Sequence, residues 1–123
     1  MEPHLHVGVE SIRPAGAGVW QVTWRVDNQG EPPVALESAW VPHGRFRGAG
    51  RLNFAPPEPL PLALEMTIHA DEAPGTVVAN AFLILRLSLG WRVFVRMRVE
   101  FDADATPHPI PELVTLQSAG AAE

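Results

Sequence analysis

The chain has 123 residues, of which 46% are apolar, with 13 Pro and 10 Gly; this composition is typical of one globular domain with many turns and excludes a disordered chain. There is no Cys and no Lys, which excludes disulfides, thiolate nucleophiles, zinc–thiolate sites and Schiff-base chemistry. The nine positive charges, all Arg, are outnumbered by 14 acids, and the formal net charge of −5 argues against a nucleic-acid partner.

We expect neither a membrane segment nor a secretory signal. No apolar run reaches the ~18 residues that a membrane-spanning helix needs. Met1 is followed by Glu2 and Pro3 rather than by a basic stretch and an apolar segment. The sequence therefore predicts a cytoplasmic protein without a membrane partner.

In the first half of the chain, apolar and polar residues alternate in short segments, the pattern of strands with one buried face. In chain order, strands are predicted over residues 4–12, 20–26 and 34–41, with a short edge strand at 52–54. The segment from Asp27 to Pro33 contains Asn, Gly and Pro and predicts a turn. Residues 42–61 are rich in Pro, Gly and Arg, so that little regular structure is expected there.

The second half of the chain predicts the longest strands and a change of character at its end. Strands are expected over residues 62–69, 76–87 and 91–101, and residues 112–117 would add one more. After Asp102 the chain is acidic, and the prolines from Thr106 to Pro111 predict extended polyproline-like backbone. We expect residues 1–102 to form the domain and residues 103–123 to form an acidic, Pro-rich C-terminal extension.

About seven short strands and no sustained helical period predict an all-β fold, an immunoglobulin-like antiparallel β-sandwich. A closed barrel is the alternative architecture. The two sheets of the sandwich should share one apolar core. The residues expected there are Trp20, Val22, Trp24, Val26, Leu64, Met66, Leu83, Leu85, Val93, Val95 and Val99.

Several turn patterns carry a resemblance to a known class of domain. They are Val22-x-Trp24-x-Val26-Asp27-Asn28-Gln29-Gly30, Pro61-Leu62-x-Leu64 and Ala73-Pro74-Gly75-Thr76. In this respect residues 4–101 resemble bacterial immunoglobulin-like accessory modules. The resemblance implies a module that binds or positions another molecule, and it implies no activity of its own.

The loop Ser88-Leu89-Gly90 fixes the register of the last hairpin. A three-residue hairpin loop ends on a left-handed residue, usually Gly, and Gly90 stands at that place. The resulting inward pairs are Leu87–Trp91, Leu85–Val93, Leu83–Val95, Ala81–Met97 and Ala79–Val99. A register shifted by one residue would bring charge into the core, so the three-residue loop is favoured.

This register predicts a mixed aromatic and arginine surface on the opposite face of the hairpin. The outward residues are Asn80, Phe82, Ile84, Arg86, Arg92, Phe94, Arg96 and Arg98. Aromatic and Arg side chains are typical of interface hot spots, and Arg opposite Arg is unfavourable unless an acid lies nearby. Two interpretations remain: the face binds a partner, or it is covered internally by the acidic segment with Asp102, Asp104 and Glu112, or paired by Glu37.

Other candidate sites are weaker. The segment with His43, Arg45, Phe46, Arg47 and Arg51 would clamp a carboxylate or phosphate, although an ordinary loop is the alternative. Four Trp residues raise the possibility of a carbohydrate-binding module. His4 and His6 have a metal-ligand spacing but no third ligand in view, and solvent-exposed His is the simpler interpretation.

No catalytic triad, nucleophile elbow or cofactor motif is present in the sequence. We therefore predict a non-enzymatic interaction module without a cofactor or metal, which uses the outer face of the last two long strands for protein–protein contact or self-association. A homodimer is the first expectation and a separate acidic protein the second. An anionic-ligand binder or enzyme built on residues 43–51, and a carbohydrate-binding module, are the alternatives.

Overall fold

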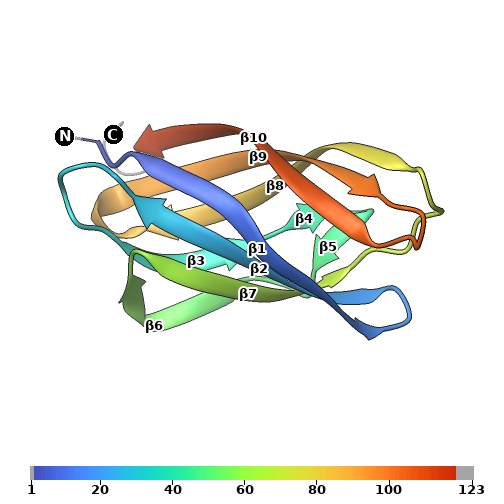
Figure 1. Cartoon of the computed structure of the whole chain (residues 1–123). Coiled ribbons are helices and arrows are strands. Elements are labelled where there is room, and N and C mark those ends of the chain that lie inside the picture. Colours follow the sequence, from blue (N-terminus) through green and yellow to red (C-terminus); the bar gives the residue numbers. More distant parts are fainter. Residues whose placement is uncertain (1, 119–123) are drawn as a thin grey trace.

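The structure, a computed structural model that describes residues 2–118, contains two five-stranded antiparallel sheets packed face to face (Figure 1). Sheet A has the order β1-β2-β7-β5-β4 and sheet B the order β10-β9-β8-β3-β6. The strands are β1 (Leu5–Gly16), β2 (Val19–Asn28), β3 (Ala35–Trp40), β4 (Pro42–His43), β5 (Phe46–Gly48), β6 (Leu52–Pro59), β7 (Leu62–His69), β8 (Val77–Leu87), β9 (Trp91–Phe101) and β10 (Pro107–Ser118). The all-β class is confirmed, and two separate sheets replace the alternative of a closed barrel.

The expected number of about seven strands is too low, since the described residues form ten. Two of the underestimated segments are rich in proline: β6 runs from Leu52 to Pro59, beyond the expected 52–54, and β10 runs from Pro107 to Ser118. Both are edge strands. Proline has no N–H to donate, but an edge strand needs donors on one side only, so it accommodates proline.

Within the acidic, Pro-rich segment, the strand expected over residues 112–117 is longer in the structure. Residues 107–118 form β10, which pairs antiparallel with β9 along its whole length. Asp102 holds the turn that reverses the chain: its Oδ1 accepts the backbone N–H groups of Asp104 at 2.8 Å and Thr106 at 3.0 Å. Its Oδ2 lies 2.8 Å from Nε2 of His108. Residues 119–123 of the predicted extension lie outside the described residues.

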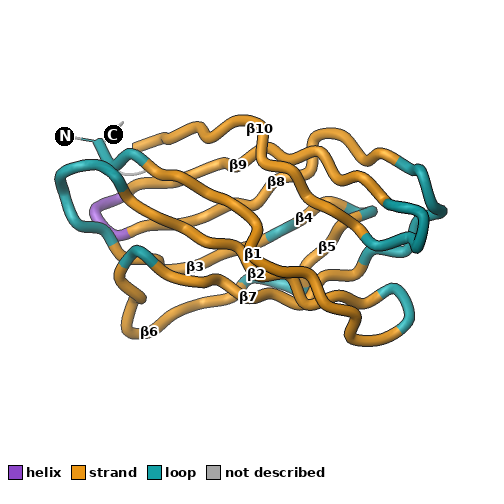
Figure 2. Tube along the Cα trace, viewed as in Figure 1, coloured by secondary structure: helices purple, strands orange, loops and turns teal. Residues whose placement is uncertain are grey.

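The core lies between the two sheets, as the alternation predicts. Ten of the eleven expected residues are buried there, and Trp20 packs at its margin, with its indole N–H donating to the Ala70 carbonyl at 2.9 Å. Trp24 is fully buried and meets Phe46 edge-on, with ring centroids 6.4 Å apart. In Figure 2 the loops gather at the two ends of the sandwich, while strands make up its body.

The β8–β9 hairpin follows the predicted register near its loop. Leu85 pairs with Val93, and Arg86 lies opposite Arg92. In the loop Ser88–Gly90, Gly90 has a left-handed backbone conformation, as expected, and Leu89 has one as well.

Across residues 2–118, no helix is long and apolar enough to span a bilayer.

Farther from the loop the predicted register is wrong. Val99 pairs with Val78 rather than with Ala79, because β8 contains one extra residue between Val78 and Ala81. This β-bulge places Asn80 at φ 57°, a left-handed conformation that Asn tolerates better than most residues. Asn80 therefore does not pair with Arg98.

Candidate functional site

The outer face of sheet B is formed by the side chains of β8 and β9 that alternate with the core residues. Phe82, Ile84 and Arg86 on β8 are half-buried or exposed, while their neighbours in the strand are buried. On β9 the same alternation leaves four side chains half-buried on the outer face, namely Arg92, Phe94, Arg96 and Arg98. Asn80 is exposed in the bulge, beyond the regular part of this face.

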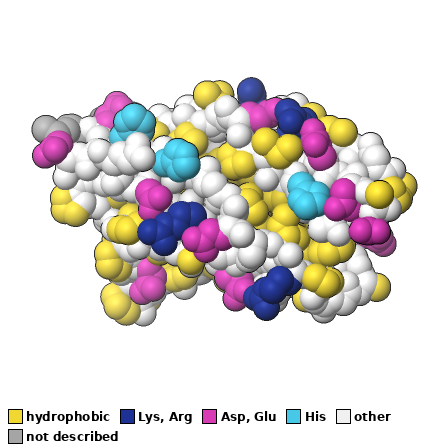
Figure 3. Space-filling model, in the orientation of Figure 1, with side chains coloured by type: hydrophobic (Ala, Val, Ile, Leu, Met, Phe, Trp, Pro, Cys, Tyr) yellow, Lys and Arg dark blue, Asp and Glu magenta, His cyan; other side chains and the backbone are white. Residues whose placement is uncertain are grey.

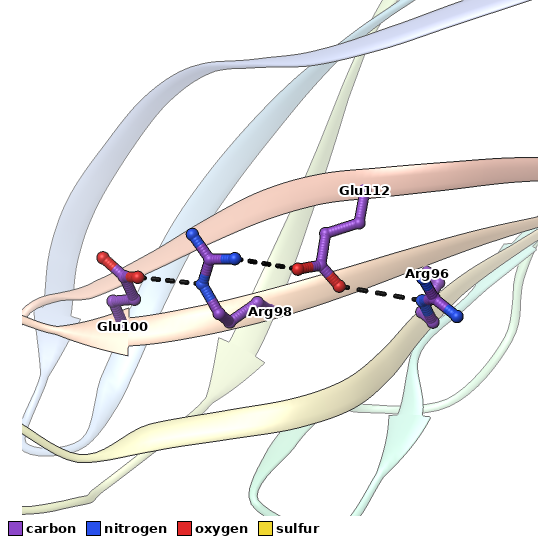
Figure 4. Close-up of polar contacts among 4 residues, drawn as sticks. All are labelled: Arg96, Arg98, Glu100 and Glu112. Atoms are coloured by element: carbon purple, nitrogen blue, oxygen red, sulfur yellow. Dashed lines mark hydrogen bonds and ion pairs between the residues drawn. The ribbon is translucent and has the colours of Figure 1, made fainter.

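On the side toward β10, carboxylates neutralise this face (Figure 4). Glu112 of β10 lies between two arginines, with its Oε2 2.8 Å from Arg98 Nη1 and its Oε1 3.6 Å from Arg96 Nε. Arg98 Nε also donates to Glu100 at 2.8 Å. Hydrogen bonding to Glu100, more than to Glu112, raises the pKa of the Arg98 guanidinium above its ordinary value. Internal cover is thus present over this half of the face.

On the side toward β3 and β6, three arginines surround a hollow of about 190 Å³. We call it the arginine hollow; it is lined by Ser38, Trp40, Arg51, Ile84, Arg86, Arg92 and Phe94. These residues come from β3, β8 and β9, and from the position just before β6. Apolar side chains and cationic groups therefore face the same small space.

The arginines of the hollow have little acidic compensation. Arg51 stacks on the indole of Trp40, with its Cζ 4.8 Å from the ring centroid. Arg86 has one acidic neighbour, Glu37, at 4.0 Å from Nε to Oε1, the limit of an ion pair. Within residues 2–118, no carboxylate lies within ion-pair distance of Arg51 or Arg92. The hollow is a cationic site open to solvent.

Most arginines of sheet A and its loops have an acidic partner; among residues 2–118, Arg47 of β5 is the exception. Figure 3 views the molecule from the side of β1, β2 and β7, and the basic side chains there lie beside acidic ones. Arg13 donates to Glu65 at 2.6 Å, and Arg25 donates to Asp27 at 3.0 Å. The arginine hollow is distinguished by three arginines at one cavity with a single carboxylate near them.

The structure disperses the arginines of residues 43–51 instead of gathering them around one loop. Phe46 is fully buried in the core. Arg45 donates to Glu72 at 2.7 Å; this hydrogen bond lowers the pKa of the Glu72 carboxyl and raises that of Arg45. Arg47 is exposed on β5, and Arg51 alone reaches the outer face of sheet B.

The backbone N–H of Arg45 donates to Nδ1 of His43 at 3.0 Å, which makes this imidazole part of the local turn. The two predicted sites thus meet only at the arginine hollow, through Arg51.

Sequence reasoning missed Ser38 and Trp40 as members of the site. An irregularity in β3 between Leu36 and Ser38 shifts the alternation, so that the apolar residues Leu36 and Ala39 are both fully buried next to β8. Ser38, which is also buried, and Trp40 line the hollow on the outer face. The spacing of apolar residues around Glu37 gives no signal for this shift.

The structure also shows where the residues of the metal-binding and carbohydrate-binding alternatives lie. Among residues 2–118, no group of three or more His, Asp or Glu side chains is arranged to hold a metal ion, and His4 and His6 are exposed. Of the four tryptophans, Trp24 is in the core, and Trp20 and Trp91 pack against it. Trp40 is covered on one face by Arg51, so the described residues form no flat platform of two Trp rings.

The comparisons with known proteins leave the site to be interpreted from its own residues. No protein-family model, no curated protein and no solved structure matches the chain.

Proposed function

We propose that the protein is a non-enzymatic, immunoglobulin-like binding module that holds an acidic segment of another protein on the outer face of sheet B. The arginine hollow is the anchor point. The observation that carries the proposal is the placement of Arg51, Arg86 and Arg92 around one hollow with a single, distant carboxylate beside them. Arg opposite Arg is unfavourable on a bare strand pair and becomes favourable when an acid lies between them.

The size of the hollow supports a side chain as its occupant. Pockets for small-molecule ligands have volumes of ~300–1,000 Å³, whereas the hollow has about 190 Å³. A side chain brings its own protein surface along, which would cover Phe82, Ile84 and Phe94 on the same face. Aromatic and Arg residues are enriched at such contacts.

A second copy of the chain is a less favourable occupant of the same face. In a symmetric dimer the same patch meets itself, which brings two arginine-rich faces together. The net charge of −5 adds a general repulsion between copies. A separate acidic partner avoids placing arginines opposite arginines at the hollow, and self-association is treated as the competing outcome of the test.

A small anion is the second candidate. It is favoured by one observation, that Arg51 from the predicted arginine-rich segment joins Arg86 and Arg92 at one cavity. The carbohydrate-binding alternative has no comparable support.

The test uses a fluorescent ten-residue peptide rich in Glu and Ala and a matched peptide with Gln for Glu, read by anisotropy. The parent protein should bind the Glu peptide, and Arg51→Gln with Arg92→Gln should abolish this binding. Arg13→Gln with Arg25→Gln is the matched control, because it removes the same charge from the opposite face, where exposed ion pairs contribute little stability.

Equal loss of binding in both double variants, or no binding to the parent, would overturn the proposal. Displacement of the peptide by free glutamate at an equal molar concentration would support the small-anion candidate instead. A light-scattering mass of a dimer that becomes monomeric in Arg51→Gln with Arg92→Gln would show that a second copy occupies the face.

A further inference from the structure

We infer that the group entering the arginine hollow is a dianionic phosphate, carried as a phosphomonoester on a side chain of the partner. This inference rests on the proposed function, since it specifies the chemistry of the anchor within that contact. Nothing else in the fold gathers cationic groups of the described chain around an apolar hollow in this way: Arg96 and Arg98 are paired with Glu112, and Arg45 with Glu72.

The charge count favours two negative charges over one. Three arginines line the hollow, and Glu37 supplies one carboxylate near Arg86, so two positive charges are left. A partner carboxylate would balance one of them and leave one arginine of the hollow without an acidic partner. A phosphomonoester carries about −1.5 to −2 charges at neutral pH and balances both.

The positions of the donors favour a tetrahedral group. Arg51 lies just before β6, Arg86 lies on β8 and Arg92 lies on β9, so the donors at the hollow come from three different segments. Ser38 of β3 adds a hydroxyl group at the lining. A phosphate offers three oxygens pointing in different directions, whereas a carboxylate offers two in one plane.

The apolar lining prepares the arginines for this role. The stack of Arg51 on Trp40 restrains the plane of the guanidinium, while its edge N–H groups remain able to donate. The half-buried side chains of Ile84 and Phe94 add an apolar lining to the hollow, and apolar surroundings strengthen the attraction between opposite charges. The carbon stem of a phosphorylated side chain would pack on the same two residues.

The test compares two acidic peptides that differ at one central position, which is phosphoserine in one and Glu in the other. The two side chains have similar lengths, so the comparison isolates the head group. We expect the parent protein to bind the phosphopeptide about tenfold more tightly than the Glu peptide, because one added charge-assisted hydrogen bond contributes about that difference in affinity. Arg92→Gln should reduce this ratio to about one, Arg92→Lys should keep part of it, and Arg47→Gln on β5 should leave it unchanged.

The pH dependence separates a dianion from a monoanion. The second pKa of a phosphomonoester is ~6, so lowering the pH from 7.5 to 5.5 should weaken binding of the phosphopeptide. Binding of the Glu peptide should change little over this range, because a Glu side chain titrates near pH 4.3. A phosphopeptide that binds equally at both pH values would overturn the inference.

Other outcomes distinguish this inference from the proposed function. If both peptides bind with equal affinity and both depend on Arg92, the phosphate inference fails and the acidic-partner proposal stands. If neither peptide binds, both fail. If inorganic phosphate displaces the phosphopeptide at an equal molar concentration, the site recognises the ion without its carrier, and the partner side chain is refuted.

Discussion

Replacing Trp24 by Ala should leave the protein barely stable or unfolded. The Trp24 side chain is fully buried, and its ring packs edge-on against Phe46 with an interplanar angle of 88°. Truncating a buried Trp to Ala costs ~3–5 kcal/mol, because the apolar contacts are lost and a cavity remains. The total stability of a domain of this size is ~5–15 kcal/mol, so this one change removes a large part of it.

Replacing Trp24 by Phe should cost much less. Among residues 2–118, Nε1 of Trp24 is the one fully buried side-chain nitrogen or oxygen without a hydrogen-bond partner. Leaving a buried donor unpaired costs ~1–3 kcal/mol. Phe removes this N–H and keeps a six-membered ring beside Phe46, so the lost volume and the relieved donor partly offset each other. We expect a net loss below about 2 kcal/mol.

Urea unfolding followed by far-ultraviolet circular dichroism measures both variants without relying on Trp fluorescence. Leu89→Ala is the control, because Leu89 is 71% exposed in the hairpin loop and should change stability by less than ~0.5 kcal/mol. Parent-like unfolding of Trp24→Ala would refute the placement of β2 in the core. Equal losses for Trp24→Phe and Trp24→Ala would show that the indole N–H is paired in solution.

Three further predictions concern the turns and the C-terminal strand. Deleting residues 103–123 should lower the thermal midpoint and the solubility, because it removes β10 and exposes the edge of β9; a truncated chain that melts like the parent would refute a structural role for β10. Gly30→Ala should cost ~1–3 kcal/mol in urea unfolding, because its Cβ would lie 2.7 Å from the His4 nitrogen, and a parent-like midpoint would contradict this. Hydrogen bonds from His108, Thr106 and Asp104 lower the pKa of Asp102 below its ordinary value of 3.8. The ionised carboxylate therefore stabilises the fold above pH 3.8, and this stabilisation is lost as the pH falls through the lowered pKa. Asp102→Asn should therefore show a smaller loss of stability between pH 5 and pH 2 than the parent, measured by thermal unfolding, and identical pH profiles would argue against the clamp.

The alternation of apolar residues determined which faces are buried. In β2 the residues Val22, Trp24 and Val26 are all fully buried, as their spacing predicts. The register of β8 and β9 near their loop also followed from local information, since a one-residue shift would have placed arginines in the core. These features depend on period and turn chemistry, which neighbouring residues specify.

The strands β6 and β10 were underestimated because proline is a local signal against strands, whereas its tolerance at an edge depends on which strand lies beside it. The β-bulges could not be predicted for the same reason, since they too depend on the neighbouring strand. The extra residue in β8 at Asn80 and the shift in β3 at Glu37 reflect how each strand fits its neighbours in sheet B. Neither is visible in the apolar pattern of the strand itself.

Part of the candidate site could likewise be predicted from the sequence, and part depends on the tertiary structure. From the sequence, the outward position of Phe94, Arg86 and Arg92 follows directly from the hairpin register. Only the tertiary structure decided that Glu112 compensates the β10 side and that Arg51 completes a hollow on the other side. These contacts join residues far apart in the chain, and a long charged side chain on a surface pairs with whatever charge the fold brings near it. The sequence by itself thus determines which side chains face outward, while the packing of the strands decides which of their charges are paired within the fold.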